Sequence, residues 1–353
     1  MQTNMMSQSS CGSTFEPVDL CDRFQGALIG LRLASTAITL DQPSSQSLLH
    51  RAIERVANDG IEQIKAFAIA PSSWELNIAC LSNSACWLPV CIPMLLRYHH
   101  DGQQRLAMLS KLLAYQSSAH QGDRALGDVD AVGANQDKIA KKELAVESVQ
   151  RSIAQILLLG DVLEAISGGA LPLAPTDWLR WLGKCSSRYS AVLSVRAHYE
   201  IALAAIAENV QIAYPTSYLA IRNADKSHCA FAAGISSALR HPESYLLAVR
   251  GLLAERGLAG NDLDGLNGLN GLNGSLANSA ANSLTEDLLF AGDLAAVCLS
   301  VCVAGFLSGA LGGRRMLPAL WQLPLSVERD LASELFRQWT GQQLIESTDY
   351  ACR

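Results

Sequence analysis

The sequence predicts an all-α protein, formed by a single multi-helix domain around one central apolar helix. Three observations lead to this prediction. Apolar residues recur at helical spacing through most of the chain. The segment 294–313 contains no charged residue. Of the 353 residues, 49% are hydrophobic and 17% are charged, which is ample for a sizeable core. We expect this domain to extend over residues 20–345.

The periodic segments predict the helices in chain order. The first helix begins at Asp22, which we expect to be its N-cap, and carries Gly26 and Gly30 for close packing against another helix. The helical period continues over residues 48–67, 139–166, 177–182, 192–213, 227–239 and 245–256. Residues from about 116 to 137 are rich in Gly, Asp and Ala. Residues from about 259 to 284 include three Leu-Asn-Gly repeats. Both ranges are predicted to be flexible loops.

The central segment, residues 294–313, has two physical interpretations. As a helix it would be about 30 Å long, enough to cross a bilayer, and Gly305, Gly309 and Gly313 have the spacing of closely packed helices. However, it is rich in Ala, Gly, Ser and Cys, it follows Asp293, and the sequence has no second segment of this kind. The centre of a large helical domain also requires a helix that is apolar on all sides. We interpret the segment as a buried core helix.

Composition limits the partners and the compartment. The formal net charge is −6 and no strongly basic stripe is present, so we expect neither nucleic acid nor a membrane as partner. Residues 1–18 lack a basic region followed by an apolar run, and we expect a disordered tail and a cytoplasmic protein. Several of the ten cysteines lie in apolar runs, which is typical of reduced core thiols. These are Cys80, Cys86, Cys91, Cys298 and Cys302.

Two groups of polar residues are candidate ligand sites. His99 and His100 precede Asp101, but adjacent side chains point apart on a helix, so we interpret them as a solvated helix end. Asp128 and the acid two positions later are spaced like the start of a calcium loop. Ile139 occupies the place of the final Glu of such a loop, and we interpret the acids as part of a solvated loop.

Three stretches of the sequence form a pattern. RFQGALIGL covers residues 23–31, SNSACWLPVCIPMLL covers residues 82–96, and AGFLSGALGGRRMLP covers residues 304–318. In order and composition they resemble the opening, pocket and closing segments of the ADP-ribosylglycohydrolase family. The resemblance implies the all-α fold of that family. It also implies that Asn83, Ser84 and Ala85 fall where the family binds ADP-ribose or a related nucleotide.

The resemblance also bears on catalysis. The family hydrolyses glycosidic bonds to ADP-ribose with two magnesium ions held mostly by carboxylates. The Gly-Asp of the family's first helix falls on Ala34 and Ser35, and its two closing aspartates fall on Ala296 and Cys298. Asp293 is the one acid that we assign to metal, by a shift of three residues. Because one carboxylate does not hold two magnesium ions, we expect no metal cofactor and assign no catalytic residue.

The sequence therefore predicts an ADP-ribosylglycohydrolase-like pseudoenzyme, a binding or structural protein with a nucleotide or a protein as partner. Two alternatives stay open. The first is an active magnesium-dependent hydrolase that removes ADP-ribose from protein or a small molecule, with acids from segments such as 123–130. The second is a helical protein attached to a membrane through residues 294–313. The sequence contains no Gly-x-Ser-x-Gly, phosphate-binding glycine-rich Lys loop or His-Glu-x-x-His motif that would indicate another hydrolase class.

Overall fold

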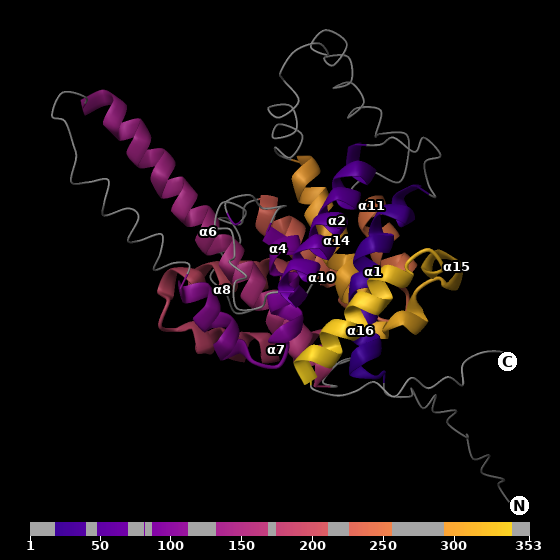
Figure 1. Cartoon of the computed structure of the whole chain (residues 1–353). Coiled ribbons are helices and arrows are strands. Elements are labelled where there is room, and N and C mark those ends of the chain that lie inside the picture. The colour runs from indigo at the N-terminus through magenta and orange to yellow at the C-terminus, as the bar shows by residue number, and fades with distance from the viewer. Residues whose placement is uncertain are drawn as a thin grey trace, which may run out of the picture.

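The computed structural model describes residues 18–39, 48–69, 81, 87–111, 132–168, 174–210, 226–255 and 293–340. These residues are mostly helical and include no strand (Figure 1), so the predicted all-α class is confirmed for them. The α-helices are α1 (Leu20–Thr39), α2 (Leu48–Ile69), α4 (Trp87–Arg97), α6 (Val132–Ser167), α7 (Pro175–Cys185), α8 (Leu193–Asn209), α10 (Lys226–Arg240), α11 (Tyr245–Glu255), α14 (Asp293–Gly312), α15 (Ala319–Gln322) and α16 (Ser326–Thr340). Two 3₁₀ turns, η2 (Ser186–Tyr189) and η5 (Arg314–Met316), and a helix over residues 102–111 complete the described elements.

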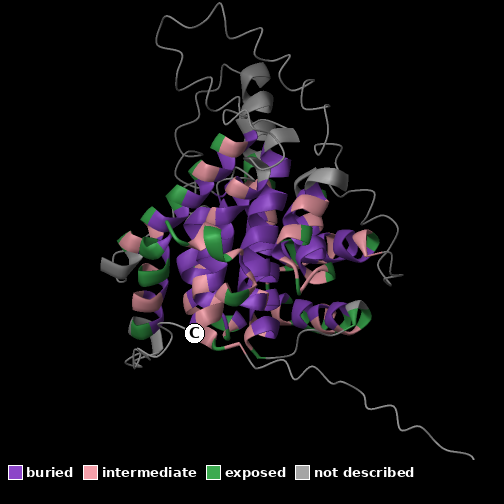
Figure 2. Ribbon diagram, turned by 90° about the vertical axis from the view of Figure 1, so that its right-hand side faces the viewer, coloured by how far each residue is buried: buried purple, intermediate pink, exposed green. Residues whose placement is uncertain are grey.

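The central apolar helix is α14. It contacts α1 and α10 most extensively, and α2, α6 and α11 also pack against it. Every side chain from Ala295 to Ala310 is buried, which Figure 2 shows as the purple centre of the domain. By length and composition the same helix could cross a membrane, yet 89% of Ala295–Gly312 is buried within the domain. The helix is therefore buried at the centre of the domain, as we predicted for a core helix.

Glycines bring α1 and α14 into backbone contact. A Cβ atom added at Gly26 would overlap the carbonyl oxygen of Gly309, and one added at Gly309 would overlap the carbonyl oxygen of Gly26. One turn away, a Cβ atom at Gly30 would overlap the carbonyl oxygen of Gly305. Since no other residue permits this approach, the small-residue spacing in both helices follows from the contact between them.

The end of α14 is held by α1. Gly313, which follows the last residue of α14, has a φ of 64° and a ψ of −171°, a backbone conformation that is essentially restricted to glycine. The last carbonyl groups of a helix have no partner within it. Here the guanidinium of Arg23 donates to the carbonyl oxygens of Ala310, at 3.1 Å, and Leu311, at 2.8 Å. Residues from opposite ends of the described chain thus complete one helix terminus.

Several boundaries differ from those predicted. α1 begins at Leu20, so Asp22 lies in its first turn and is not the N-cap. α7 begins at Pro175, whose fixed φ suits the first turn of a helix, two residues before the predicted start at residue 177, and its N-cap is Ala174. α6 begins at Val132, so residues 132–137 are helical where we expected a loop. Residues 1–17, 112–131 and 256–292, with Cys80 and Cys86, lie outside the described ranges.

Candidate functional site

The site residues implied by the family resemblance are not among the described side chains. Asn83, Ser84 and Ala85 lie in the undescribed range 82–86. Asp293 is the first residue of α14, and only its backbone is described. The assignment of a nucleotide site to the first three residues and of a metal to Asp293 therefore stays a prediction.

The structure does describe the residues that the resemblance aligns with the family's other metal positions. Ser35 is 5% exposed in α1, and its hydroxyl donates to the carbonyl oxygen of Arg32 at 3.0 Å within the same helix. Ala296 and Cys298, in α14, are 6% and 0% exposed. Within the described parts of the chain, no group of three or more His, Cys, Asp or Glu side chains could hold a metal ion.

The cysteines of α14 are buried thiols. Cys298 and Cys302 are fully buried, and Cys91 in α4 is fully buried as well. Burial, together with the neighbouring Cys298, raises the pKa of the Cys302 thiol. Because a thiol binds a metal as the thiolate, this environment favours packing over metal binding. The prediction of core thiols is confirmed for these three residues.

His99 corrects one of our sequence interpretations. Residues 98–100 form a turn after α4, and His99 folds into the protein, where it is 9% exposed. Its Nδ1 atom lies 2.9 Å from the carbonyl oxygen of Leu96, and its ring meets Phe24 edge-on at 5.2 Å. Burial lowers the pKa of His99. Our interpretation of a solvated helix end is therefore wrong for His99, whereas His100 is exposed.

A buried polar cluster, which the sequence did not reveal, lies where helix 102–111, α6, η2 and α8 meet. We call it the Arg105–Asp161 cluster. It consists of two arginines, two carboxylates and two phenols: Arg105, Arg188, Asp161, Glu164, Tyr189 and Tyr199. Arg105 and Asp161 have fully buried side chains, which is rare for charged residues unless they are paired.

Asp161 is the centre of the hydrogen bonds in this cluster. Arg105 Nη2 donates to Asp161 Oδ1 at 2.6 Å and to Glu164 Oε2 at 3.1 Å. The Tyr189 hydroxyl lies 2.9 Å from both oxygens of Asp161, and the Tyr199 hydroxyl donates to Oδ2 at 2.8 Å. Three side chains from three segments thus converge on one carboxylate, which satisfies a group that burial would otherwise destabilise.

The ionisable groups in the cluster stabilise one another's charged or donor forms. Burial raises the pKa of Asp161, while Arg105 and the two phenol donors oppose this rise and favour the carboxylate. Burial opposes the charge on Arg105, but Asp161, Tyr189 and Glu164 together raise its pKa. Burial and the charge of Asp161 raise the pKa of Tyr199, so the phenol stays protonated as a donor. The geometry at the centre of the cluster is that of an ion pair between Arg105 and Asp161, with Tyr189 and Tyr199 as hydroxyl donors.

Two glycines make room for the buried guanidinium. A Cβ atom at Gly160 would overlap the Nε and Cδ atoms of Arg105. A Cβ atom at Gly102 would lie 3.1 Å from Arg188 Nη1 and 3.3 Å from Arg105 Nη2. Glycine inside a helix costs about 1 kcal/mol relative to alanine. The space required by Arg105 accounts for a glycine in the middle of α6.

The surface end of the cluster is closed by a second pair. Arg188 is 33% exposed, and its Nη1 atom donates to Glu164 Oε1 at 3.0 Å and to Oε2 at 2.9 Å. The Arg188 guanidinium also lies over the ring of Trp181, 5.9 Å from its centroid. Both carboxylates of the cluster are thus engaged by arginines, and the arrangement joins four elements of the fold rather than presenting a free functional group.

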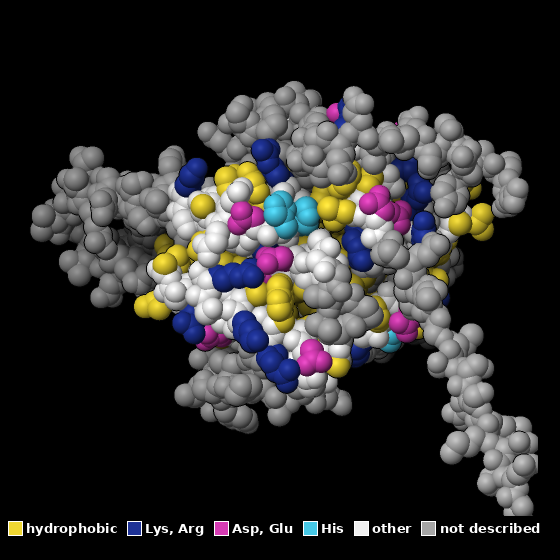
Figure 3. Space-filling view, turned by 90° about the horizontal axis from the view of Figure 1, so that it is seen from below, with side chains coloured by type: hydrophobic (Ala, Val, Ile, Leu, Met, Phe, Trp, Pro, Cys, Tyr) yellow, Lys and Arg dark blue, Asp and Glu magenta, His cyan; other side chains and the backbone are white. Residues whose placement is uncertain are grey.

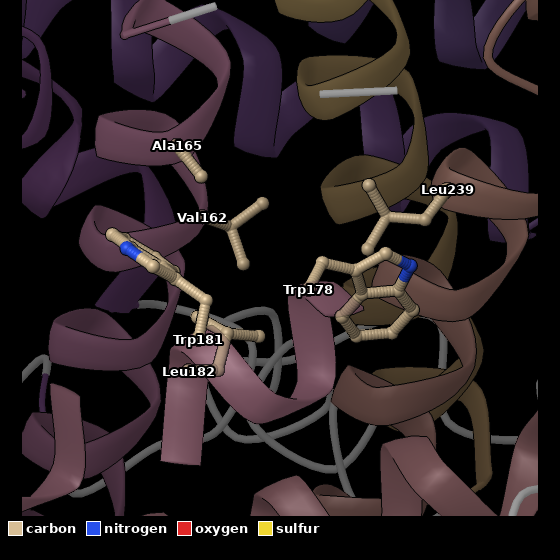
Figure 4. Close-up of a pocket in the computed structure, with 6 residues that line it drawn as sticks. All are labelled: Val162, Ala165, Trp178, Trp181, Leu182 and Leu239. Atoms are coloured by element: carbon tan, nitrogen blue, oxygen red, sulfur yellow. The ribbon is translucent and has the colours of Figure 1, made fainter. Parts of the chain in front are cut away.

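A small cavity is shown in Figure 4, and Trp181, whose ring lies against Arg188 of the cluster, is one of the residues that line it. Its volume is about 10 Å³, room for one water molecule. The side chains around it come from α6, α7 and α10, and they are mainly apolar: Val162, Ala165, Trp178, Trp181, Leu182 and Leu239. A cavity of this size does not accommodate a nucleotide, and the tryptophans pack the helices together, as their spacing indicates.

Comparison of the chain with models of known protein families, with curated proteins and with solved structures finds no match. The resemblance to ADP-ribosylglycohydrolases therefore rests on the sequence stretches at residues 23–31, 82–96 and 304–318. Acidic and basic side chains are interspersed over the face shown in Figure 3, and no large area of one sign is visible there.

Proposed function

We propose that this protein is a binding or structural protein of ADP-ribosylglycohydrolase type that does not use dinuclear magnesium catalysis. One observation carries the proposal. The positions that the resemblance assigns to magnesium carboxylates hold Ser35, Ala296 and Cys298, which are all buried and include no carboxylate. Magnesium requires several oxygen ligands in nearly octahedral geometry, and these side chains do not supply them.

The surroundings of these positions support the proposal further. Ser35 lies in α1 and Cys298 in α14, and these two helices pack along each other. A carboxylate introduced into such a packed interior would be deprived of water, which is costly unless a cation or several donors compensate for it. A metal site at these positions would therefore require several introduced carboxylates together with the ion that compensates their charge.

The acids of the Arg105–Asp161 cluster do not replace the missing ligands. Asp161 accepts hydrogen bonds from Arg105, Tyr189 and Tyr199, and Glu164 pairs with Arg188. A magnesium ion would have to displace two arginines from these carboxylates and enter a closed interior. We therefore assign this cluster to the stability of the scaffold, and we propose a nucleotide or a protein as the partner.

The proposal is tested by two measurements on the purified full chain. The first is isothermal titration with ADP-ribose in the presence and absence of magnesium, repeated with the Asn83→Ala variant. The second is chromatographic detection of ADP-ribose released from ADP-ribosylated protein, with an active member of the family as the positive control. We expect no magnesium-dependent release, and any binding of ADP-ribose should be unaffected by magnesium. Release that requires magnesium and disappears in Asp293→Ala would refute the proposal.

A further inference from the structure

The turn over residues 98–100 is fastened to the domain through a buried histidine. The turn joins α4 to helix 102–111, and His99 is buried within it. The His99 ring contacts Phe24 of α1 edge-on at 5.2 Å, and Phe24 contacts Phe336 of α16 in the same way at 5.6 Å. Both phenylalanines are buried. His99 therefore covers an aromatic contact between two helices that pack against each other (Figure 1).

The hydrogen bond of His99 determines where the ring takes up a second proton. Its Nδ1 atom lies 2.9 Å from the carbonyl oxygen of Leu96. Because a carbonyl oxygen only accepts hydrogen bonds, Nδ1 carries the hydrogen in this contact, and Nε2 is the nitrogen that binds a proton from water. Protonation leaves the bond to Leu96 in place. What the turn then has to accommodate is a positive charge beside an aromatic ring.

The nearest ionisable groups are mostly unfavourable to that charge. The ring of His100 lies 4.8 Å from that of His99, and the fully buried Arg105 donates to the carbonyl oxygen of Tyr98 in the same turn. Both groups oppose a charge on His99. Glu164 of α6 favours it, but this carboxylate already pairs with two arginines.

The other charged residues of the turn and its flanking helices have partners of their own. Asp101 accepts a hydrogen bond from the backbone of Gln104 at 2.9 Å, and the guanidinium of Arg97 lies over the ring of Tyr98. Burial is therefore the largest influence on His99, and it lowers the pKa of the imidazole below its ordinary value of 6.5.

On α1 and α16, the charged neighbours of the two phenylalanines also have partners. Arg23 donates to carbonyl oxygens at the end of α14, and Asp22 lies 3.9 Å from Arg314. Arg337 pairs with Glu334 within α16. These helices thus present an aromatic surface to the turn and offer its imidazole no carboxylate among the printed contacts of Phe24.

We propose that the turn over residues 98–100 is an acid-sensitive hinge, in which protonation of His99 drives its ring away from Phe24 into solvent and releases the turn from α1. In the open form the imidazolium is hydrated, and the aromatic contact between α1 and α16 loses its cover. Because Arg105 donates to the backbone of Tyr98, movement of the turn also removes an acceptor from the Arg105–Asp161 cluster and loosens helix 102–111. This inference is independent of the proposed function, because it involves neither the nucleotide site nor the metal positions.

The direction of the pH dependence follows from the uptake of a proton. A hydrated histidine has a pKa of about 6.5, whereas burial lowers the pKa of His99 in the closed form. Below about pH 6.5 the open form therefore binds more protons than the closed form. Opening becomes more favourable as the pH falls, by at most about tenfold per pH unit for a single proton.

The test is hydrogen exchange of the full chain between about pH 7.5 and about pH 5, followed by mass spectrometry and corrected for the intrinsic pH dependence of exchange. We expect the amides of residues 98–111 to exchange about threefold to tenfold faster at the lower pH, while those of α14 keep their protection. His99→Asn retains a side-chain donor but cannot gain a charge, so it should abolish the acceleration. The matched control His100→Asn, at the exposed neighbour, should retain it.

Two outcomes of this experiment overturn the inference. The first is an equal acceleration in the wild-type chain and in His99→Asn, and the second is an acceleration that includes α14, which indicates global unfolding. If His99→Asn does not fold, nuclear magnetic resonance of the His99 ring in the wild-type chain decides. We expect the ring to stay neutral, with its hydrogen on Nδ1, below about pH 6.5. Titration of His99 at or above that pH would also overturn the inference.

Discussion

Asp161 is the residue on which the buried polar cluster depends. Its carboxylate accepts hydrogen bonds from one guanidinium and two phenols, and the side chain of Asp161 is fully buried. A buried ion pair contributes little net stability compared with apolar packing, but removal of one partner leaves a buried charge without compensation. The two carboxylates Asp161 and Asp177 therefore offer a direct comparison, since Asp177 pairs with Arg180 at the surface.

We predict that Asp161→Asn lowers the free energy of unfolding by about 3–5 kcal/mol, because the buried Arg105 loses its buried counter-charge and keeps only Glu164, which it shares with Arg188. Asp177→Asn should lower it by less than about 1 kcal/mol, since its pair with Arg180 is exposed to solvent. Urea denaturation of both variants at neutral pH measures the difference. Similar small losses in the two variants would show that the cluster does not stabilise the fold.

The raised pKa values of two buried thiols predict that the protein loses stability in alkaline solution. Burial raises the pKa of Cys21 to about 11 and that of Cys185 to about 12, from an ordinary value of 9.0. Between about pH 9 and these values, the folded chain binds more protons than the unfolded chain, so stability must fall as the pH rises. Below about pH 9 the contribution of these thiols is fully present.

We therefore expect the free energy of unfolding to decrease as the pH is raised from about 9 to about 11. Cys185→Ala should show a shallower decrease than the wild-type chain, because one of the titrating thiols is gone. Urea denaturation at several pH values compares the two slopes, with Cys229→Ala, at an exposed position, as the control. Identical slopes for the wild-type chain and Cys185→Ala would contradict the role of burial.

At the scale of helices, the glycines of α1 and α14 bring the two backbones into direct contact. Gly26 and Gly309 leave no space for a methyl group on either side. Gly251 in α11 provides a contrast, because a Cβ atom there would have only the Ser237 hydroxyl within reach, at 4.0 Å. The same substitution should therefore have opposite effects in the two places.

We predict that Gly309→Ala lowers the free energy of unfolding by about 3 kcal/mol, because the two backbones must separate to admit the methyl group. Gly251→Ala should raise it by about 0.5–1 kcal/mol, since alanine is the better helix former and meets no obstacle. Thermal and urea unfolding of both variants provide the measurement. Equal tolerance of alanine at the two positions would mean that the two helices do not pack as described.

At the scale of the whole molecule, the burial of α14 favours the core interpretation over the membrane interpretation. Helices α1, α2, α10 and α11 surround it, so its apolar residues already have protein neighbours. Exposure to lipid would require these helices to separate. We expect the expressed chain to be released from membranes by alkaline carbonate in the absence of detergent. If the chain stays in the membrane fraction like an integral membrane control protein, the result would support attachment to the membrane through residues 294–313.

Much of this architecture could be predicted from local sequence signals. The uncharged run before Gly313 marked the central helix, and Gly26, Gly30, Gly305 and Gly309 marked its close contact with α1. These features depend on neighbouring positions in the sequence, and helical spacing makes them visible. The helix boundaries were less certain, because α6 begins with residues such as Gly133 and Asn135 that are also typical of loops.

The Arg105–Asp161 cluster could not be predicted in the same way. Arg105 and Asp161 are 56 positions apart, and no period in the sequence connects them. A partial signal was present, because Asp161 follows three consecutive leucines and Gly160 inside an apolar helix. A buried acid requires a partner, but its identity depends on how the helices pack. The ligand residues Asn83, Ser84 and Ala85 stay predictions for a different reason, since they fall outside the described ranges.

The pairing of α1 with α14 has a consequence for how the protein is made. Arg23 and Ala310, which form one hydrogen bond, are 287 positions apart. A ribosome adds about 5–20 residues per second, so α1 leaves the exit tunnel roughly 15–60 s before the helix that covers it. During this interval its apolar face is available to chaperones or to other nascent chains. Translation that stops before α14 would release a product with this face exposed, which is a substrate for cellular quality control.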